Sequence, residues 1–149
     1  MTTPALWQLW VDGTALPNPG RIGLGAVLRS ASGEQTTHAA IGPRHGCNNE
    51  AEMQALIAGL QLALAHHARH LHVVSDSDFV VRHVLGTQRT AVPRFAPLIA
   101  EAQALLSRFD QVTLTWQPRH RNPEADALAR GALGLPPSPP PSPRKRRRG

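Results

Sequence analysis

The sequence predicts an α/β fold in which a mixed five-stranded sheet carries helices on both of its faces. Two observations lead to this fold class. The N-terminal part holds three short apolar segments separated by turn residues, and the rest of the chain alternates short apolar segments with longer helical ones. Strands that follow one another through tight turns pair antiparallel, whereas strands separated by helices pair parallel. The sheet should therefore begin with three antiparallel strands and continue with parallel ones.

Three strands are expected in the N-terminal part. The first covers residues 6–12, and the segment 17–25, PNPGRIGLG, forms a turn because it is dense in glycine and proline. The second strand covers residues 26–30 and the third covers 35–41, with a serine-glycine turn between them that closes a hairpin. These three segments form the antiparallel part of the sheet.

Helices and strands alternate in the remainder of the folded region. Segments whose apolar residues recur every three to four positions are predicted as helices, and short β-branched segments between them as strands. In chain order they are a helix from Asn48 or Asn49 to about His66, a strand over 71–75, a helix from about Asp78, a helix over 95–108, a strand over 112–116 and a helix over 123–133.

The first of these helices has a carboxylate on its apolar side. Its apolar stripe consists of Met53, Leu56, Ile57, Leu60 and Leu64. Glu52 lies four residues before Leu56, so its side chain belongs to the inward side of the helix. A carboxylate that points toward the core requires a specific partner, because an unpaired buried charge is costly.

Three further carboxylates occupy comparable places. Asp12 and Asp76 end the first and fourth predicted strands, and Asp126 lies in the first turn of the last helix. Each has an ordinary structural explanation when it is taken singly. Asp12 would belong to an Asp-Gly turn, Asn49 and Glu52 would form a capping box, Asp76 would cap the next helix, and Asp126 would complement a helix N-terminus. Taken together, the four positions favour a common site at the carboxyl ends of the strands.

Divalent metal is the economical partner for such a group of carboxylates. The nearest basic residues in sequence are Arg119 and Arg121, which are too few to neutralise four acids. Oxygen ligands without a Cys or His cluster suit magnesium or manganese better than zinc. Four carboxylates can hold two such ions a few ångströms apart, an arrangement used for in-line displacement at phosphorus.

The net charge of +6 is concentrated at the C-terminus. The segment 144-RKRRRG-149 carries five positive charges, which leaves 11 of the 16 Lys+Arg residues against 10 Asp+Glu residues elsewhere. Residues 135–143, LPPSPPPSP, exclude helix and sheet because proline fixes φ and lacks an N–H donor. We therefore predict a folded domain over 1–134 and a disordered, proline-rich, basic tail over 135–149. The tail either adds salt-sensitive phosphate contacts or serves only to solubilise the protein.

Cysteine usage and hydropathy indicate the compartment. The single cysteine, Cys47, excludes an internal disulfide and fits a reducing cytoplasm. No segment has the apolar length of a membrane span, so no membrane association is expected.

Four blocks of the sequence resemble type 1 ribonuclease H in family order and at family-like spacing. They are 11-VDGTALPNPGRIGLG-25, 48-NNEAE-52, 74-VSDSDFVV-81 and 116-WQPRHRNPEADALAR-130. The resemblance covers residues 6–134 and implies a ribonuclease H-like fold. It also implies a monomeric enzyme that cuts the RNA strand of RNA/DNA hybrids and leaves 5′-phosphate and 3′-hydroxyl ends.

By motif match, the resemblance assigns the four acids to two magnesium ions, with manganese as an alternative. The metal ligands and catalytic residues are Asp12, Glu52, Asp76 and Asp126. One metal ion would activate the attacking water and the other would stabilise the leaving oxygen.

The resemblance also assigns residues to substrate binding. Asn18, Asn48 and Asn49 match positions that touch the hybrid in its minor groove, where an amide can both donate to and accept from a 2′-hydroxyl. Gly13 matches a position where the backbone approaches the RNA closely. The alternatives are a turn residue for Asn18 and a helix cap for Asn48.

Two positions near the last helix carry weaker implications. His120 falls where longer family members have a histidine that shuttles protons or aids product release, and its alternative is a surface histidine. Asn122 would orient the water or the final acid, and its alternative is the N-cap of the last helix. The Lys- and Trp-rich insertion of some members is missing from 82-RHVLGTQRTAVPR-94, so the arginines of that segment would grip the hybrid less strongly.

Three other functions stay open from the sequence. One is a nuclease of the same superfamily that prefers double-stranded RNA. A second is a hybrid-binding module that does not cut, which the presence of all four acids argues against. A third is an adaptor that docks through its proline-rich segment, 136-PPSPPPSP-143.

Overall fold

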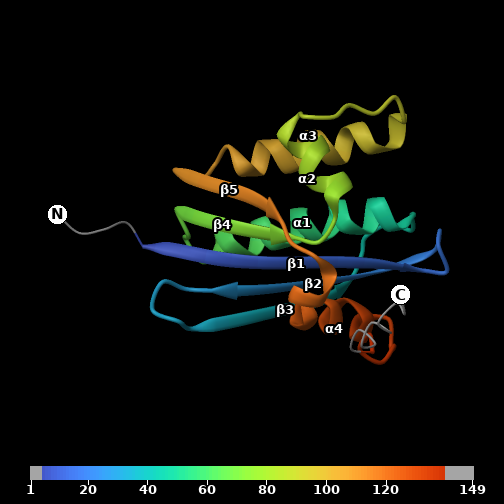
Figure 1. Ribbon diagram of the computed structural model, residues 1–149, viewed down its shortest axis with the longest axis horizontal. Coiled ribbons are helices and arrows are strands. Elements are labelled where there is room, and N and C mark those ends of the chain that lie inside the picture. The colour runs from blue at the N-terminus through green and yellow to red at the C-terminus, as the bar shows by residue number, and fades with distance from the viewer. Residues whose placement is uncertain (1–4, 140–149) are drawn as a thin grey trace, which may run out of the picture.

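The computed structural model describes residues 5–139, which form one mixed sheet with helices on both faces (Figure 1). The strand order is β3-β2-β1-β4-β5, with β1–β2 and β2–β3 antiparallel and β1–β4 and β4–β5 parallel. This topology confirms the predicted fold class. The strands are β1 (Leu6–Leu16), β2 (Arg21–Arg29), β3 (Gln35–Ile41), β4 (His70–Ser75) and β5 (Gln111–Trp116).

Two helices cover opposite faces of the sheet at close range. A Cβ built on Gly13 of β1 would overlap the carbonyl oxygen of Ala51, and one built on Gly25 of β2 would overlap that of Ala125. Gly13 pairs with Leu24, the residue before Gly25. Because successive residues of a strand point to opposite faces, positions 13 and 25 face opposite sides of the sheet. The helices are α1 (Asn48–Ala65), α2 (Asp78–Leu85), α3 (Ala96–Leu106) and α4 (Pro123–Ala132), with short 3₁₀ turns at Pro93–Phe95 and Arg119–Arg121.

The first two strands are longer than predicted. β1 continues to Leu16, and β2 already begins at Arg21 inside the segment predicted as a turn. The glycines of that segment serve helix packing, because a Cβ at Gly23 or Gly25 would collide with the backbone of α4. Glycine often marks a turn, but here it lets a helix approach the sheet. Asp12 consequently lies inside β1, opposite Gly25, and does not end the strand.

Helix α1 is buried on more than one side. Its predicted apolar stripe is in the core, with Met53, Leu56 and Leu60 fully buried. The residues between them, including Gln54 and Ala55, are buried as well. The helix lies between the sheet and α3, so both of its sides are covered. This placement makes α1 the central helix and fixes the orientation of Glu52.

Within residues 5–139, every helix is too short or too polar to traverse a lipid bilayer.

Candidate active site

The site forms where the parallel pairing of β1 and β4 stops. The last parallel pair is Val11 with Ser75, so Asp12 and Asp76 are the next residues on the two chains. β1 continues along β2, whereas the chain leaves the sheet after Ser75. The end of β4 thus leaves room for side chains beside β1, and the two aspartates face that space.

Glu52 enters the same space from α1. Its Oε1 accepts a hydrogen bond of 2.7 Å from the backbone N–H of Gly13, which ties the helix to β1 next to Asp12. The carboxylates of Asp12, Glu52 and Asp76 each offer an oxygen atom, and these three atoms lie within 4.8 Å of one another. Asp126 of α4 lines the same cleft. The site therefore combines side chains from β1, α1, the end of β4 and α4.

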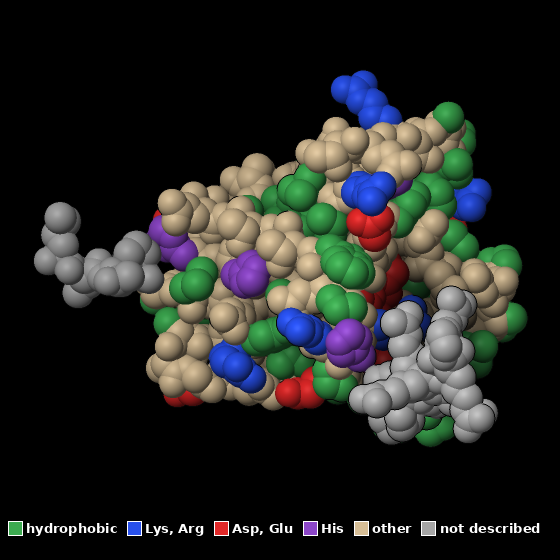
Figure 2. Space-filling model, in the orientation of Figure 1, with side chains coloured by type: hydrophobic (Ala, Val, Ile, Leu, Met, Phe, Trp, Pro, Cys, Tyr) green, Lys and Arg blue, Asp and Glu red, His purple; other side chains and the backbone are tan. Residues whose placement is uncertain are grey.

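The carboxylates line a cleft of about 250 Å³. Figure 2 shows acidic side chains gathered in a hollow on this face of the molecule, with basic side chains beside them. Asp12, Glu52 and Asp126 are buried, with exposed fractions of 3%, 8% and 8%. The other lining residues are Gly13, Thr14, Ala15, Asn48, Asn49, Asp76, Ser77, Arg119, Arg130 and Ser138.

The structure overturns the ordinary explanations for three of the acids. Asp12 and Gly13 are paired strand residues and form no turn. The cap of α1 involves Cys47, whose N–H donates to Glu50 Oε1 at 3.1 Å, so Glu52 is no part of a capping box. The cap of α2 is Ser77, whose hydroxyl accepts from Val80 N–H at 3.2 Å. The side chains of Asp12, Glu52 and Asp76 therefore have no turn or capping role and are available to bind a ligand in the cleft.

Burial and mutual repulsion make these carboxyls reluctant to ionise. The pKa of Asp12 is raised to about 7, mainly by burial. A hydrogen bond with Glu52 opposes the rise, and the negative charges of Asp76 and Asp126 add to it. Burial also raises the pKa of Glu52 well above its usual value, with Asp12 as the next cause. The pKa of Asp76 is raised by burial too, although Glu52, Arg119 and Asn122 oppose the shift. The protein without metal holds protons in this site that the unfolded chain would release.

The metal-free protein is therefore expected to lose stability as pH rises from about 4 to about 7. Below the ordinary pKa of 3.8, Asp12 is protonated in both states and its contribution is fully present. It is lost as pH rises through the folded-state pKa, because only the folded state must then ionise a buried carboxyl. Thermal melts in EDTA should show Tm falling by on the order of 5 °C across this range. Asp12→Asn should flatten the profile, and a profile of unchanged slope would contradict the assignment.

The donor set fits divalent cations. All the ligand atoms are carboxylate oxygens, which Mg²⁺ and Mn²⁺ prefer. The Oδ2 atom of Asp76 is buried and has no hydrogen-bond partner among the described residues. An unpartnered buried carboxylate oxygen next to two other acids is satisfied by a cation, which would also return the three carboxyls to their charged forms.

Two of the three amides predicted to touch the minor groove line the cleft. Asn48 and Asn49 line it, whereas Asn18 does not. Asn48 Oδ1 accepts from the N–H of Ala15 at 3.0 Å, and Asn18 Oδ1 accepts from the N–H of Asn48 at 3.1 Å. The amide oxygens of Asn18 and Asn48 thus fix the start of α1 against β1. Gly13 also lines the cleft, but its lack of a side chain is already required by the packing of α1.

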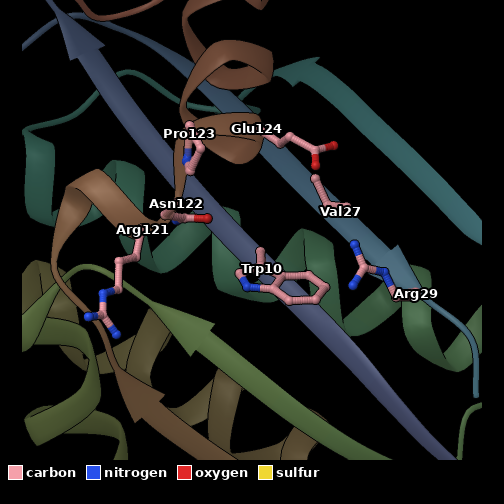
Figure 3. Close-up of a pocket in the computed structure, with 7 residues that line it drawn as sticks. All are labelled: Trp10, Val27, Arg29, Arg121, Asn122, Pro123 and Glu124. Carbon is pink, nitrogen blue, oxygen red and sulfur yellow. The ribbon is translucent and has the colours of Figure 1, made fainter. Parts of the chain in front are cut away.

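Asn122 and His120 differ in their placement. Asn122 is 2% exposed, and its Nδ2 donates to the carbonyl oxygen of Val11 at 2.9 Å. Asn122 occupies the N-cap position of α4, as its alternative interpretation expected, although its side chain makes no capping hydrogen bond. It also lines a cavity of about 200 Å³ together with Trp10, shown in Figure 3. His120 is exposed in the 3₁₀ turn and does not line the cleft.

Sequence reasoning does not assign a role in the cleft to Arg130, Arg119 or Ser138. Arg130 lies one helical turn after Asp126, and that spacing alone places the two side chains on the same face of α4. Arg119 is only a neighbour in sequence, yet it lines the cleft and favours the charged form of Asp76. Ser138 carries no signal, because it lies in the segment predicted to be a disordered tail.

Known proteins share this sequence pattern and this fold. A family model described as reverse transcriptase-like matches residues 10–132. The crystal structure of RNase H1 from the halophilic archaeon Halobacterium salinarum superposes with a TM-score of 0.82 and 32% identity. That match covers 87% of this chain and 98% of the archaeal one. The chain belongs to the type 1 ribonuclease H family.

Two further solved ribonuclease H structures are similar to this chain. The N-terminal RNase H domain of Rv2228c from Mycobacterium tuberculosis has a TM-score of 0.77 and 34% identity, over 87% of this chain and 94% of that one. LC11-RNase H1, solved in complex with an RNA/DNA hybrid, has a TM-score of 0.77 and 26% identity, over 86% and 96%. The chain spans only 34% of the length of the full mycobacterial protein and 62% of that of the halobacterial ribonuclease HI.

Proposed function

We propose that this chain is an endonuclease that hydrolyses the RNA strand of RNA/DNA hybrids and leaves 5′-phosphate and 3′-hydroxyl ends. The observation that carries the proposal is the meeting of Asp12, Glu52 and Asp76, whose ligand atoms lie within 4.8 Å of one another. Asp126 stands close enough to Asp12 to raise the pKa of that carboxyl. A family relative, LC11-RNase H1, was solved with an RNA/DNA hybrid, which supports this substrate class.

The four carboxylates would hold two divalent ions, Mg²⁺ or Mn²⁺. When bound, the ions supply an activated water and neutralise charge on the leaving oxygen. The protein's part is to keep the four acids in place. The N–H of Gly13 orients Glu52. The strands of the sheet fix Asp12 and hold the chain just before Asp76.

Other residues would bind and orient the substrate. Asn48 and Asn49 present amides at the rim, where they suit the 2′-hydroxyls of a minor groove. Asn18 supports them by holding the backbone of Asn48. The backbone of Gly13 would face the RNA. Recognition of this kind depends on groove shape and 2′-hydroxyls, so cleavage should be insensitive to base sequence.

Residues of the turn before α4 would complete the site. Arg119 places a positive charge beside Asp76, where the scissile phosphate would lie. Asn122 would stabilise the site through its hydrogen bond to the carbonyl oxygen of Val11, the residue before Asp12. His120 neighbours Arg119 in the exposed turn, so it would exchange protons with solvent and aid product release.

A gel assay tests the function directly. An end-labelled RNA/DNA hybrid is incubated with magnesium, manganese or EDTA, beside matched single-stranded RNA, double-stranded RNA and DNA duplex. Metal-dependent internal cuts confined to the RNA strand of the hybrid are expected. Preferential cutting of double-stranded RNA would indicate the alternative nuclease, and retarded hybrid without cutting would indicate a binding module. Ligation and phosphatase treatment of the products identify the chemical groups at their ends.

The proposal extends to the organisation of the chain. Residues 1–134 would act as a monomeric domain in the cytoplasm, with the basic run 144–148 as an accessory contact for the hybrid. The basic run lies outside the described residues. Size-exclusion chromatography with light scattering measures the oligomeric state.

Replacing all five basic residues of 144–148 by glutamine is expected to weaken hybrid binding most at low salt. Every phosphate that the run no longer neutralises should make the slope of log K against log [salt] shallower by about 0.9. The change should therefore reach roughly four units if most of the run is engaged. Fluorescence anisotropy across a salt series measures this slope. A slope equal to that of the unmodified protein would show that the run touches no phosphate.

A further inference from the structure

The chain turns back along α4 after that helix ends. Gly134 adopts a left-handed conformation with φ of 76°, and the N–H of Leu135 donates to the carbonyl oxygen of Arg130 at 3.0 Å. A left-handed glycine at this position reverses the chain direction. The following residues therefore run beside α4 toward Asp126, on the side of the helix that faces the cleft.

Two hydrogen bonds hold this returning segment, residues 135–138, against the helix. Arg130 Nε donates to the carbonyl oxygen of Pro136 at 2.7 Å. The backbone N–H of Ser138 donates to Asp126 Oδ2 at 3.2 Å. Asp126 and Arg130 share one face of α4, so both bonds lie in line along the cleft. Ser138 itself lines the cleft together with the four carboxylates.

The sequence of the segment makes Ser138 its essential donor. Residues 136, 137 and 139 are prolines, which lack a backbone N–H. Ser138 is therefore the one residue of 136–139 that can donate a backbone hydrogen bond to a carboxylate. The bond supplies partial positive charge to a group that the other acids crowd, which is also what a metal ion supplies.

We propose that the active-site cleft is also the docking site of the chain's own segment 135–138, which occupies Asp126 until metal and hybrid displace it. The proposal rests on the function proposed above and adds its regulation. Asp126 Oδ2 cannot keep the Ser138 N–H as its neighbour and offer the same lone pair to a cation. Ser138 also lines the cleft that holds the four acids, which a nucleic acid strand would have to enter to reach them.

The residues that follow provide a physical reason for displacement by substrate. The basic run begins at Arg144, six residues after Ser138, and six residues of chain span at most about 22 Å. Phosphates of a hybrid at the cleft attract this run and draw the segment away from the acids. Substrate binding and opening of the cleft are then the same event.

The test compares Ser138→Pro with Ser138→Ala in the full chain. Proline removes the N–H donor, whereas alanine removes only the hydroxyl and keeps the donor. Mg²⁺ affinity without substrate is measured by isothermal titration calorimetry, and hybrid affinity in EDTA by fluorescence anisotropy. Ser138→Pro should bind Mg²⁺ roughly tenfold more tightly, since one hydrogen bond to a charged group no longer competes. It should also bind hybrid more tightly, and Ser138→Ala should match the unmodified protein within about twofold.

The outcomes are separable from those of the cleavage assay. Equal Mg²⁺ affinities for the two variants would overturn the docking proposal even if the hybrid is cut normally. Weaker Mg²⁺ binding by Ser138→Pro would overturn it as well, because the segment would then be holding Asp126 in its productive position. A protein that shows the expected affinities yet cuts no hybrid would instead refute the proposed function. Circular dichroism of both variants checks that the overall helix content is unchanged.

Discussion

Asp76→Asn is expected to lower the rate of hybrid cleavage by roughly a thousandfold or more while the fold stays intact. Asparagine has nearly the volume of aspartate but removes one negative charge and one ligand oxygen from the group of three acids. Because burial raises the pKa of Asp76, the loss of its charge should leave the metal-free protein as stable as before or more so. Single-turnover cleavage of a labelled hybrid measures the first effect, and thermal melting in EDTA measures the second.

Asp78→Asn is the matched control for this variant. Asp78 lies two residues further on, in the first turn of α2, where its half-exposed side chain pairs with Arg82 at 2.9 Å. The same chemical change there removes only an exposed ion pair, which contributes less than about 1 kcal/mol. Cleavage should stay within about twofold of the unmodified rate. If Asp76→Asn also cleaved at nearly the unmodified rate, the proposed metal site would be wrong.

Gly13→Ala is expected to destabilise the protein by about 3 kcal/mol. The added Cβ would overlap the backbone carbonyl of Ala51, which belongs to α1 and cannot rotate aside. The helix must move away from β1, and the hydrogen bond from Gly13 N–H to Glu52 must lengthen. One methyl group should therefore reduce both stability and Mg²⁺ affinity. Urea denaturation and calorimetry measure the two quantities.

Gly131→Ala controls for the generic effect of replacing glycine. Gly131 lies exposed in α4, and a Cβ there would meet no atom within 4 Å. Alanine favours helix by about 1 kcal/mol relative to glycine, so this variant should be neutral or more stable. Equal urea midpoints for Gly13→Ala and Gly131→Ala would show that α1 approaches β1 less closely than described.

The order of elements is predictable from the sequence because the apolar patterns of strands and helices differ in period. The turn predicted over 17–25 is present at residues 17–19, but the prediction is wrong for 21–25, which belong to β2. Glycine is frequent both where a chain turns and where a helix approaches a strand. Only the position of α4, set by residues a hundred places later, shows that Gly23 and Gly25 belong to β2. The same long-range packing buries both sides of α1, which a one-sided stripe does not reveal.

The candidate site is predictable in its acids and less so in its surroundings. The sequence predicts Asp12, Glu52 and Asp76 at strand and helix ends, and the structure brings them together although β1 continues past Asp12. Their individual roles stay predictions. The predicted caps are wrong, since Cys47 and Ser77 lie one residue or more away from the residues expected to cap. The place of Ser138 is beyond prediction, because a single hydrogen bond to Asp126 depends on how the chain leaves α4.

The residue that caps α1 also has a practical consequence for spectroscopy. Cys47 is the sole cysteine of the sequence, is half-buried, and directly precedes Asn48 on the rim of the cleft. A thiol-reactive fluorophore would therefore attach at one place in the natural sequence, beside the surface expected to receive the minor groove. Stopped-flow fluorescence of that label would follow hybrid arrival and departure in real time, without any engineered cysteine.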